Sequence, residues 1–465
     1  MPHLGVTVLP EYLQYESVTG VLDRLQASGV NAVTTSPYVM ELADSRSGAR
    51  EPPIDAGAGD VRLLDRELWG QRELWVRTAP SFVPKTQLYA GLRYQPPPPD
   101  ELTRREGSVI REFISSARER SMTTCFQVQS AIPPGYRVQF GGPHDEDQPR
   151  MHDGRIPAAR VANNGSLASP EIIGYQHALL RDLCSQYPDL DAIRVDWPEY
   201  PPYSLDDMFV DFSEHARIAA ERLGFDFQRM QRDTNRLYAY LHGGLAELPL
   251  LRWDDDLAWR YGIANLCLEL PGVIELVRFK AQLVDELLSG FRRVIDEAGR
   301  PEMGLIANLF PWPWSLASGA TTYRHVARHC SSLAVKLYGM HWKMMFRFYC
   351  DQLLKHNPDL DPSRLVSALL RVFDIMDASA PLDPEAYAYP GPEEAHGVSA
   401  AAQRRKIDLA RSAAGDTPVH ALVHGYGPAH DFRSRFEVAK QSSPDGIWIN
   451  RYGYLSDEKL AIVGG

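Results

Sequence analysis

Short runs of apolar and β-branched residues alternate along this chain with longer stretches in which apolar residues recur at helical spacing. Such alternation is typical of a parallel sheet whose strands are joined by crossover helices. The runs expected to form strands span residues 5–9, 31–36, 123–129, 192–196, 303–308, 333–338, 419–424 and 446–452. Eight strands, each followed by a helix, predict a closed (β/α)8 TIM barrel of the α/β class.

Capping residues support the helices between these runs. Four predicted helices start at Ser17, Ser169, Pro271 and Ser399 and extend to about residues 27, 186, 298 and 413. An open, doubly wound sheet is the alternative fold. It is disfavoured because the first strand is followed by Leu9-Pro10-Glu11-Tyr12 and not by a glycine-rich phosphate-binding turn.

Three connections are much longer than ordinary loops, and we expect them to be insertions in a single barrel domain that spans residues 1–465. They cover residues 39–108, 197–270 and 339–398; the second has a mostly helical pattern, and the third mixes helical and proline-rich stretches. Each follows the C-terminal end of a predicted strand, on the face where barrel enzymes carry their sites. The aromatic residues at 60–95 predict a lid or a subunit interface, so a homo-oligomer is among the expectations.

Strand alternation sorts the polar side chains. The set that faces the helices must be apolar, and in the fourth strand this set is Ile193 and Val195, so Arg194 and Asp196 are expected to point inward. The same rule sends further side chains into the barrel: Thr7, Gln127, Gln129, Asn308, Lys336, Tyr338, His420, His424, Trp448, Asn450 and Tyr452. Because burying such groups unpaired costs several kcal/mol each, they must bind one another or a ligand. A buried ion network with no further role is the alternative to an active site.

Charge and composition narrow the range of partners. Lys plus Arg total 49 against 60 Asp plus Glu, which gives a net charge of −11, whereas proteins that bind nucleic acid or anionic membranes need a cationic surface. No apolar run is long enough for a membrane span, and the N-terminal residues show no secretory pattern. The five cysteines are scattered without CxxC spacing, which indicates reduced thiols. We therefore expect a cytoplasmic protein with no nucleic-acid, membrane or metal partner.

The fourth-strand segment carries a family resemblance. Residues 191–203, DAIRVDWPEYPPY, resemble a block of the hypothetical glycoside hydrolase-like (β/α)8 barrels and the Arg-x-Asp element of the α-amylase superfamily. Residues 164–171, NGSLASPE, and the helix from residue 275 also resemble the first group. The resemblance implies an enzyme that hydrolyses glycosides, with Asp196 as nucleophile and Arg194 holding it ionised. Two positions depart from the α-amylase pattern, since Asn308 ends strand five in place of a glutamic acid and His424-Gly-Tyr-Gly replaces the strand-seven His-Asp.

Glycoside cleavage usually takes two carboxyl groups, about 5–5.5 Å apart in retaining enzymes and about 6.5–9.5 Å apart in inverting ones. The candidate partners of Asp196 are, in order, Glu199 between stiffening prolines, Glu11 at the end of strand one, and Glu394 in the loop after strand six. The residues expected to contact the carbohydrate are Arg194, Lys336, Asn308, Gln127, Gln129, Tyr338, Trp197, His424, His396, Asn450, Arg451 and Tyr452.

Three other functions remain open. Lys336 occupies a place that resembles the lysine of class I aldolases, so a Schiff-base lyase, an aldolase or a sugar isomerase is the second hypothesis. His420, His424 and His430 lie near strand seven, which keeps a metal-dependent barrel enzyme as the third, although no HxH or HExxH element occurs. The fourth is a sugar-binding barrel without activity. No cofactor is expected.

Overall fold

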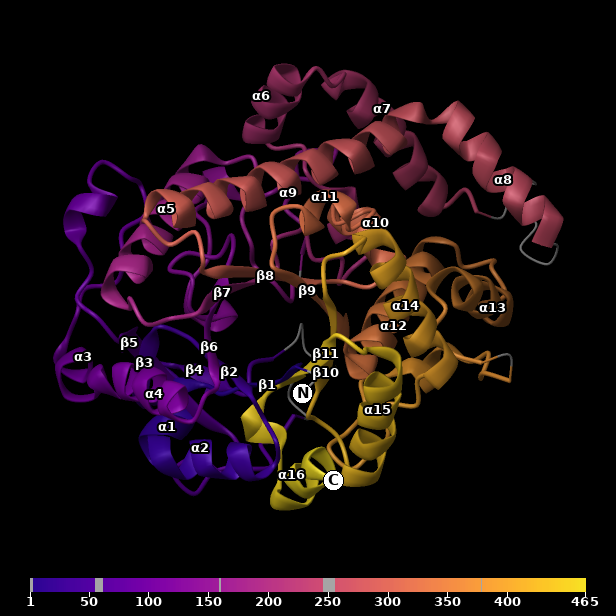
Figure 1. Ribbon diagram of the computed structural model, residues 1–465. Coiled ribbons are helices and arrows are strands. Elements are labelled where there is room, and N and C mark those ends of the chain that lie inside the picture. The colour runs from indigo at the N-terminus through magenta and orange to yellow at the C-terminus, as the bar shows by residue number, and fades with distance from the viewer. Residues whose placement is uncertain (1–2, 55–61, 159, 246–255, 378) are drawn as a thin grey trace.

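The computed structural model describes residues 3–54, 62–158, 160–245, 256–377 and 379–465. Its barrel strands are β1 (His3–Thr7), β2 (Ala32–Thr35), β6 (Thr123–Gln129), β7 (Ala192–Asp196), β8 (Gly304–Leu309), β9 (Ser332–Leu337), β10 (Val419–His424) and β11 (Gly446–Asn450). These strands are parallel and close in the order β1-β11-β10-β9-β8-β7-β6-β2, so the last strand pairs with the first (Figure 1). The predicted (β/α)8 barrel is confirmed.

The expected strands coincide with the observed ones to within about two residues, and the first and the eighth both end earlier than expected. Leu9 has an extended backbone, and Pro10 begins the short helix α1 (Pro10–Tyr15). Proline favours the first position of a helix because its φ is already helical and it lacks the N–H that would have no partner there. Glu11 therefore lies in the first turn of a helix and not at the end of strand one, which corrects that prediction.

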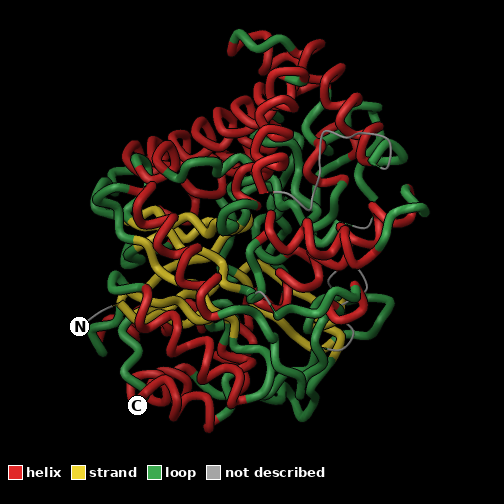
Figure 2. Tube along the Cα trace, turned by 90° about the vertical axis from the view of Figure 1, so that its right-hand side faces the viewer, coloured by secondary structure: helices red, strands yellow, loops and turns green. Residues whose placement is uncertain are grey.

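The helices that follow the barrel strands begin where the capping residues predicted. Ser17, Ser169 and Ser399 each accept a hydrogen bond from a backbone N–H in the first turn. The helices are α2 (Val18–Ala27), α4 (Ser108–Glu119), α5 (Pro170–Gln186), α9 (Pro271–Glu297), α11 (Arg324–Ala327), α14 (Ala400–Ala414), α15 (Ala429–Ser442) and α16 (Asp457–Gly464). Figure 2 shows helices around the strands. None of the described helices is both long and apolar enough to cross a bilayer.

The connections after β2, β7 and β9 hold additional elements. After β2 come β3 (Tyr38–Leu42), β4 (Ala49–Glu51) and β5 (Leu74–Pro80), an antiparallel sheet of order β3-β5-β4, then η2 (Thr86–Tyr89) and α3 (Glu101–Glu106). After β7 come η5 (Asp206–Phe209), α6 (Glu214–Leu223), α7 (Phe227–Leu241) and α8 (Asp256–Glu269). After β9 come α12 (Gly339–His356), α13 (Pro362–Phe373) and η6 (Pro384–Tyr387). Sequence patterns did not predict the small sheet, and the division into one domain with three insertions stays a prediction.

The remaining short elements also follow barrel strands. They are η3 (Val138–Phe140) and η4 (Asp145–Asp147) after β6, α10 (Trp314–Ser318) after β8, and η7 (Tyr452–Tyr454) after β11.

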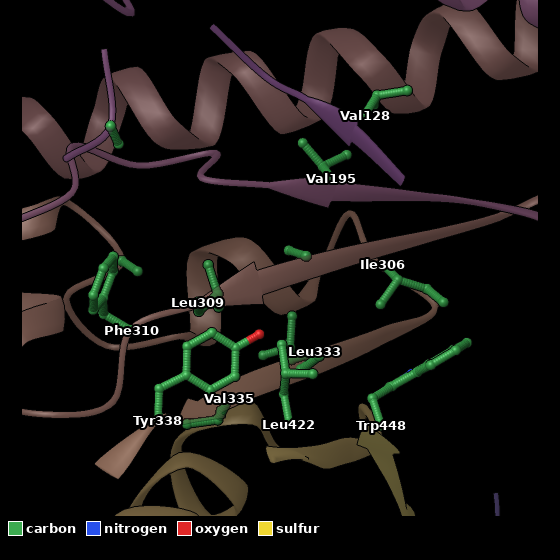
Figure 3. Close-up of a cluster of buried hydrophobic side chains, with 14 of the residues drawn as sticks. Val128, Val195, Ile306, Leu309, Phe310, Leu333, Val335, Tyr338, Leu422 and Trp448 are labelled. Atoms are coloured by element: carbon green, nitrogen blue, oxygen red, sulfur yellow. The ribbon is translucent and has the colours of Figure 1, made fainter. Parts of the chain in front are cut away.

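A large aromatic side chain fills the N-terminal half of the barrel. Trp448 of β11 is fully buried and lies in register with Gly5 of β1. A Cβ atom added at Gly5 would lie 2.2 Å from Cε3 of the indole, so this position requires glycine. The guanidinium of Arg194 lies over the Trp448 ring, 4.4 Å from its centroid. Figure 3 shows Trp448 and Leu422 extending from β11 and β10 among the buried apolar side chains.

The contact between Gly5 and Trp448 predicts a selective loss of stability. Gly5→Ala should lower the free energy of unfolding by about 1–3 kcal/mol, because the indole has to move out of a packed interior. Gly20→Ala in α2 is the matched control, since its nearest neighbour is the Ser17 hydroxyl at 3.2 Å. That change should be neutral or stabilising, because alanine is the better helix former. Equal effects of the two substitutions in urea unfolding would contradict the packing argument.

Candidate active site

A pocket opens at the C-terminal ends of the barrel strands. The residues predicted to form a site that line this pocket are Gln127, Gln129, Asp196, Trp197, Lys336, Tyr338, His424, Asn450 and Arg451. They come from β6, β7, β9, β10 and β11 or from the residues directly after them. Strand alternation therefore places these side chains at one opening, as the sequence pattern predicted.

The centre of the pocket is an ion pair. Asp196 Oδ1 lies 2.9 Å from Lys336 Nζ, and the side chain of Asp196 is 16% exposed against 3% for that of Lys336. Gln127 donates a hydrogen bond of 3.4 Å to Oδ2 of the same carboxylate, and Asn308 donates one of 3.4 Å to Oδ1. The carboxylate is therefore the part of the pair that solvent and a ligand can reach.

Arg194 lies one layer deeper than this pair. Its Nε donates a hydrogen bond of 2.7 Å to Asn308 Oδ1, and its Nη1 donates one of 3.0 Å to Thr7 Oγ1. Burial lowers the pKa of Arg194. The resemblance implied that Arg194 is the direct partner of Asp196, but the structure gives that place to Lys336. Asn308 bonds both Arg194 and Asp196, so it connects the buried layer to the pocket.

The chain turns sharply after Asp196. Trp197 has a φ of 49°, in the left-handed region that a bulky side chain rarely adopts. Its N–H donates a hydrogen bond of 3.2 Å to Asp196 Oδ1, which fixes the carboxylate relative to the turn. Strained backbone of this kind concentrates at functional sites, so the turn supports a functional role for the end of β7.

The first candidate for the second carboxyl, Glu199, is fully buried and does not line the pocket. It accepts hydrogen bonds from Phe310 N, at 2.7 Å, and from the Ser318 hydroxyl. Burial raises its pKa to about 7, against the opposing charge of Lys336. The ammonium group of Lys336 therefore acts on both Glu199 and Asp196.

The other two carboxyl candidates also lie outside the pocket lining. Glu11 is buried, with Oε1 3.3 Å from Arg137 Nη1, and burial raises its pKa to about 7. Glu394 is exposed, and its Oε2 accepts a hydrogen bond of 3.0 Å from Gly391 N. Among the described lining residues, Asp196 is the only carboxylate.

Four further predicted contacts lie away from the pocket lining. Arg194 and Asn308 sit beneath it in the network described above. His396 is fully buried against Tyr426, with ring centroids 6.0 Å apart, and burial holds its pKa well below the usual range. The Tyr452 hydroxyl donates a hydrogen bond of 2.7 Å to Glu16, the residue that follows α1.

Sequence reasoning missed a group of lining residues that come from loops and from the first turn of α12. These are Arg62, Tyr136, Arg137, Tyr203 and His341. Arg137 and Arg451 both bind the buried carboxylate of Glu51, at 2.5 Å each, and Glu51 ends the unpredicted strand β4. Strand alternation cannot place such residues, because they lie outside the barrel strands. The only signal was the position of Arg137 shortly after strand three.

Comparisons with known proteins add structural neighbours but no family. No family model and no curated protein matches the sequence. Similar solved structures include the beta-galactosidase from the psychrophilic Marinomonas ef1, at TM-score 0.48 and 10% identity, which covers 97% of this chain. The catalytic domain of beta-amylase from Paenibacillus polymyxa has a TM-score of 0.48 at 10% identity, over 98% of this chain and 94% of that one. A chitinase from Chromobacterium violaceum has a TM-score of 0.37 at 10% identity, over 98% of each chain.

This chain spans 54% of the length of the Marinomonas beta-galactosidase chain. At such identities, and with TM-scores below 0.5, these neighbours carry no argument about activity. The barrel is established by the pairing of its own strands. The described residues contain no group of three His, Cys, Asp or Glu side chains placed to hold a metal ion.

The raised pKa of Glu199 predicts how stability changes with pH. Its ordinary pKa is 4.5 and its pKa in the folded protein is about 7, so in this window the folded state holds a proton that the unfolded state releases. The contribution of Glu199 to the free energy of unfolding should therefore fall as pH rises from 4.5 to 7 and level off above it. Glu199→Gln should remove part of that fall in urea unfolding curves measured across the window.

The exposed Glu394 offers a matched control for this experiment. Glu394→Gln should leave the pH profile of the wild type unchanged, because the side chain is exposed in both the folded and the unfolded states. Glu11 acts in the same direction as Glu199 and is present in all three proteins, so the difference isolates Glu199. Identical profiles for the wild type and Glu199→Gln would contradict the protonation argument.

Proposed function

We propose that this protein is a carbohydrate-active enzyme that hydrolyses a glycosidic bond, with Asp196 as the carboxylate that faces the sugar. One observation carries the proposal: Asp196 ends β7 at a pocket on the C-terminal side of the barrel, where Lys336 lies 2.9 Å from its carboxylate. In barrel enzymes this side carries the catalytic groups.

The ion pair suits the chemistry of a glycosidic bond. A neighbouring ammonium group favours the charged form of a carboxylate. An ionised carboxylate beside the anomeric carbon stabilises the positive charge of an oxocarbenium-like transition state or attacks it as a nucleophile. The bonds from Gln127, Asn308 and the Trp197 N–H hold the carboxylate in one orientation, so little reorganisation is needed during the reaction.

The rest of the lining suits a sugar. The side-chain amides of Gln127, Gln129 and Asn450 can both donate to and accept from hydroxyl groups. Trp197 and Tyr338 present flat apolar rings next to these amides, which matches the mixed surface of a pyranose. A pocket for a purely apolar ligand would not need so many amide and charged groups.

Glu199 remains our first candidate for the second carboxyl. Its pKa of about 7 suits an acid at neutral pH, and the charge of Lys336 acts on it as well as on Asp196. A direct role requires that substrate binding draws Glu199 away from Ser318 and Phe310. Without such a movement, Glu199 acts through Lys336 as a positioning residue. Glu11 and Glu394 stay the second and third candidates.

Schiff-base chemistry at Lys336 is the second candidate function, since this lysine lines the pocket. Attack on a carbonyl needs a free lysine nitrogen, whereas the Asp196 carboxylate engages this nitrogen at 2.9 Å. The cytoplasmic location and the homo-oligomer expected from the sequence stay predictions.

Borohydride treatment with aldose and ketose sugars separates the two functions. No stable adduct at Lys336 is expected by peptide mass spectrometry, because its nitrogen is engaged by the Asp196 carboxylate at 2.9 Å. A covalent sugar adduct on Lys336, absent in Lys336→Arg, would favour the lyase, aldolase or isomerase reaction.

Substitution of Asp196 tests the proposed hydrolase directly. On a panel of aryl glycosides, Asp196→Asn should lower kcat/KM by about 10³-fold or more, because the amide can neither carry the charge nor act as nucleophile. Glu112→Gln, at an exposed position of α4, should retain the wild-type rate. Thermal unfolding should show that both variants are folded. A folded Asp196→Asn protein with nearly full activity would refute the role of Asp196.

A further inference from the structure

Another groove lies outside the barrel, where α1, β3 and α3 meet Trp69 of the loop before β5. Figure 1 shows these three elements next to one another, outside the ring of barrel strands. The described residues that line this groove differ from those that line the pocket at Asp196. Its volume of about 490 Å³ falls in the range of about 300–1,000 Å³ that small-molecule sites occupy. We call it the Trp69 groove.

A tight hairpin turn carries the Trp69 side chain. Leu68 and Gln71 exchange two backbone hydrogen bonds, of 2.9 and 3.0 Å, so Trp69 and Gly70 form a two-residue turn. Both residues have a positive φ, 49° for Trp69 and 76° for Gly70. Asn-Gly is a preferred pair for such a turn, and a bulky residue at positive φ is an outlier. The chain therefore keeps an indole where an asparagine would suit the backbone better.

Large apolar side chains beside this turn are open to solvent. Tyr15 at the end of α1 is 46% exposed, and its ring centroid lies 6.1 Å from that of the half-buried Trp69. Leu42 at the end of β3 is 47% exposed and lines the groove. Single exposed apolar residues are ordinary, but a cluster of them at a groove indicates a place where a ligand or a partner binds.

The charged side chains of the groove belong to a network of ion pairs. Arg105 binds Glu41 at 2.5 Å and Glu106 at 3.1 Å. Arg77 binds the other oxygen of Glu41, and it binds Asp100 at 2.7 Å. Each arginine is thus shared between two carboxylates, which disfavours an anionic ligand. Hydroxyl groups suit this surface, because they donate to carboxylates and accept from guanidinium groups.

The edge of β3 at the groove is closed to an added strand. Gln14 accepts a hydrogen bond from Met40 N and donates one to Met40 O, both of 2.9 Å. These backbone groups lie on the outer edge of β3, since its partner β5 is on the other side. An extended peptide needs such groups to join a sheet. The groove therefore favours a ligand other than a peptide strand.

A partly exposed indole beside groups that bind hydroxyls matches a sugar, which has apolar faces and polar edges. We propose that the Trp69 groove is a second carbohydrate-binding site, which holds a neutral oligosaccharide or polysaccharide chain away from Asp196. The choice of a carbohydrate among neutral, hydroxyl-rich ligands rests on the proposed function, whereas the groove itself does not.

The same strand connects the groove to the pocket at Asp196. Tyr38 at the start of β3 donates a hydrogen bond of 3.5 Å to Glu11, which binds Arg137 of the pocket lining. Leu42 lies four residues further along β3, which is about 13 Å. A chain held in the groove keeps its glycosidic bonds close to Asp196, so their effective concentration there rises. The natural substrate in this account is a polymer of several sugar units.

Affinity electrophoresis on the folded Asp196→Asn protein tests the groove without turnover. The probes are soluble starch, laminarin, a mixed-linkage β-glucan, arabinoxylan and galactomannan. At least one should retard the protein relative to a non-binding reference protein. Adding Trp69→Asn should weaken that binding by about 10-fold or more, because the aromatic ring is lost. Retardation by none of the five polymers, or retardation that Trp69→Asn leaves unchanged, would overturn the proposal.

Further variants locate the effect, and thermal unfolding verifies that each of them is folded. Trp69→Asn should fold, because asparagine suits the turn. Leu42→Lys, at an exposed edge position that tolerates lysine, should also weaken binding by placing a charged chain over the groove. Trp69→Phe should restore part of the affinity. Trp75→Ala is the matched control, since Trp75 is 39% exposed on the same small sheet and is not among the described lining residues. An equal loss in Trp75→Ala would contradict the assignment.

A second copy of this chain is the alternative occupant of the groove. Sedimentation equilibrium should give the same mass for the wild type and for Trp69→Asn. A wild-type oligomer that Trp69→Asn dissociates would overturn the proposal, because a partner subunit would then cover the groove.

Hydrolysis of small aryl glycosides separates this inference from the proposed function. Trp69→Asn in the otherwise wild-type protein should keep kcat/KM on aryl glycosides and lower it on the polysaccharide that the groove binds. Hydrolysis that depends on Asp196, without polysaccharide binding that depends on Trp69, would leave the proposed function intact and remove this inference. Polysaccharide binding that depends on Trp69, in a protein that hydrolyses no glycoside, would leave the groove intact and remove the hydrolase.

Discussion

The ion pair between Asp196 and Lys336 is the interaction on which the site depends. These residues lie near the C-terminal ends of β7 and β9, which are separated by β8, so they meet only because alternation turns both side chains into a closed barrel. Two charges in a place this poorly exposed cost free energy unless they are paired and hydrogen-bonded. Gln127 and Asn308 supply those hydrogen bonds, which offset part of the cost of burying the two charges. The resulting arrangement leaves the carboxylate of Asp196 facing a pocket.

The site is built in layers from the barrel floor upward. Trp448 against Gly5 fills the floor, Arg194 covers the indole, and Asn308 connects Arg194 to Asp196. Above them, the amides and aromatic rings at the strand ends form the walls. This polar interior differs from that of a barrel filled by Val, Ile and Leu. Its hydrogen bonds hold the charged groups in fixed positions.

The sequence predicted the parts of this structure that depend on local pattern. Strand alternation placed Arg194, Asp196, Lys336 and Asn450 on the inner face, since a period of two needs only neighbouring residues. It failed where the chain leaves the strands: Pro10 puts Glu11 in a helix, and the second carboxyl is absent from the described pocket lining. The pairing of Arg137 with Arg451 through a shared carboxylate was missed for the same reason. It depends on Glu51, which a small antiparallel sheet brings to the barrel from the connection after β2, and no local pattern encodes that long-range contact.

A crystal structure of the folded Asp196→Asn protein with a slowly turned-over oligosaccharide bound is the most direct measurement. The account predicts that the side chain of residue 196 lies beside the anomeric carbon of one sugar residue, with Lys336 behind it and the ring between Trp197 and Asn450. A sugar bound elsewhere on the molecule, or one whose anomeric carbon lies far from residue 196 in this pocket, would contradict it.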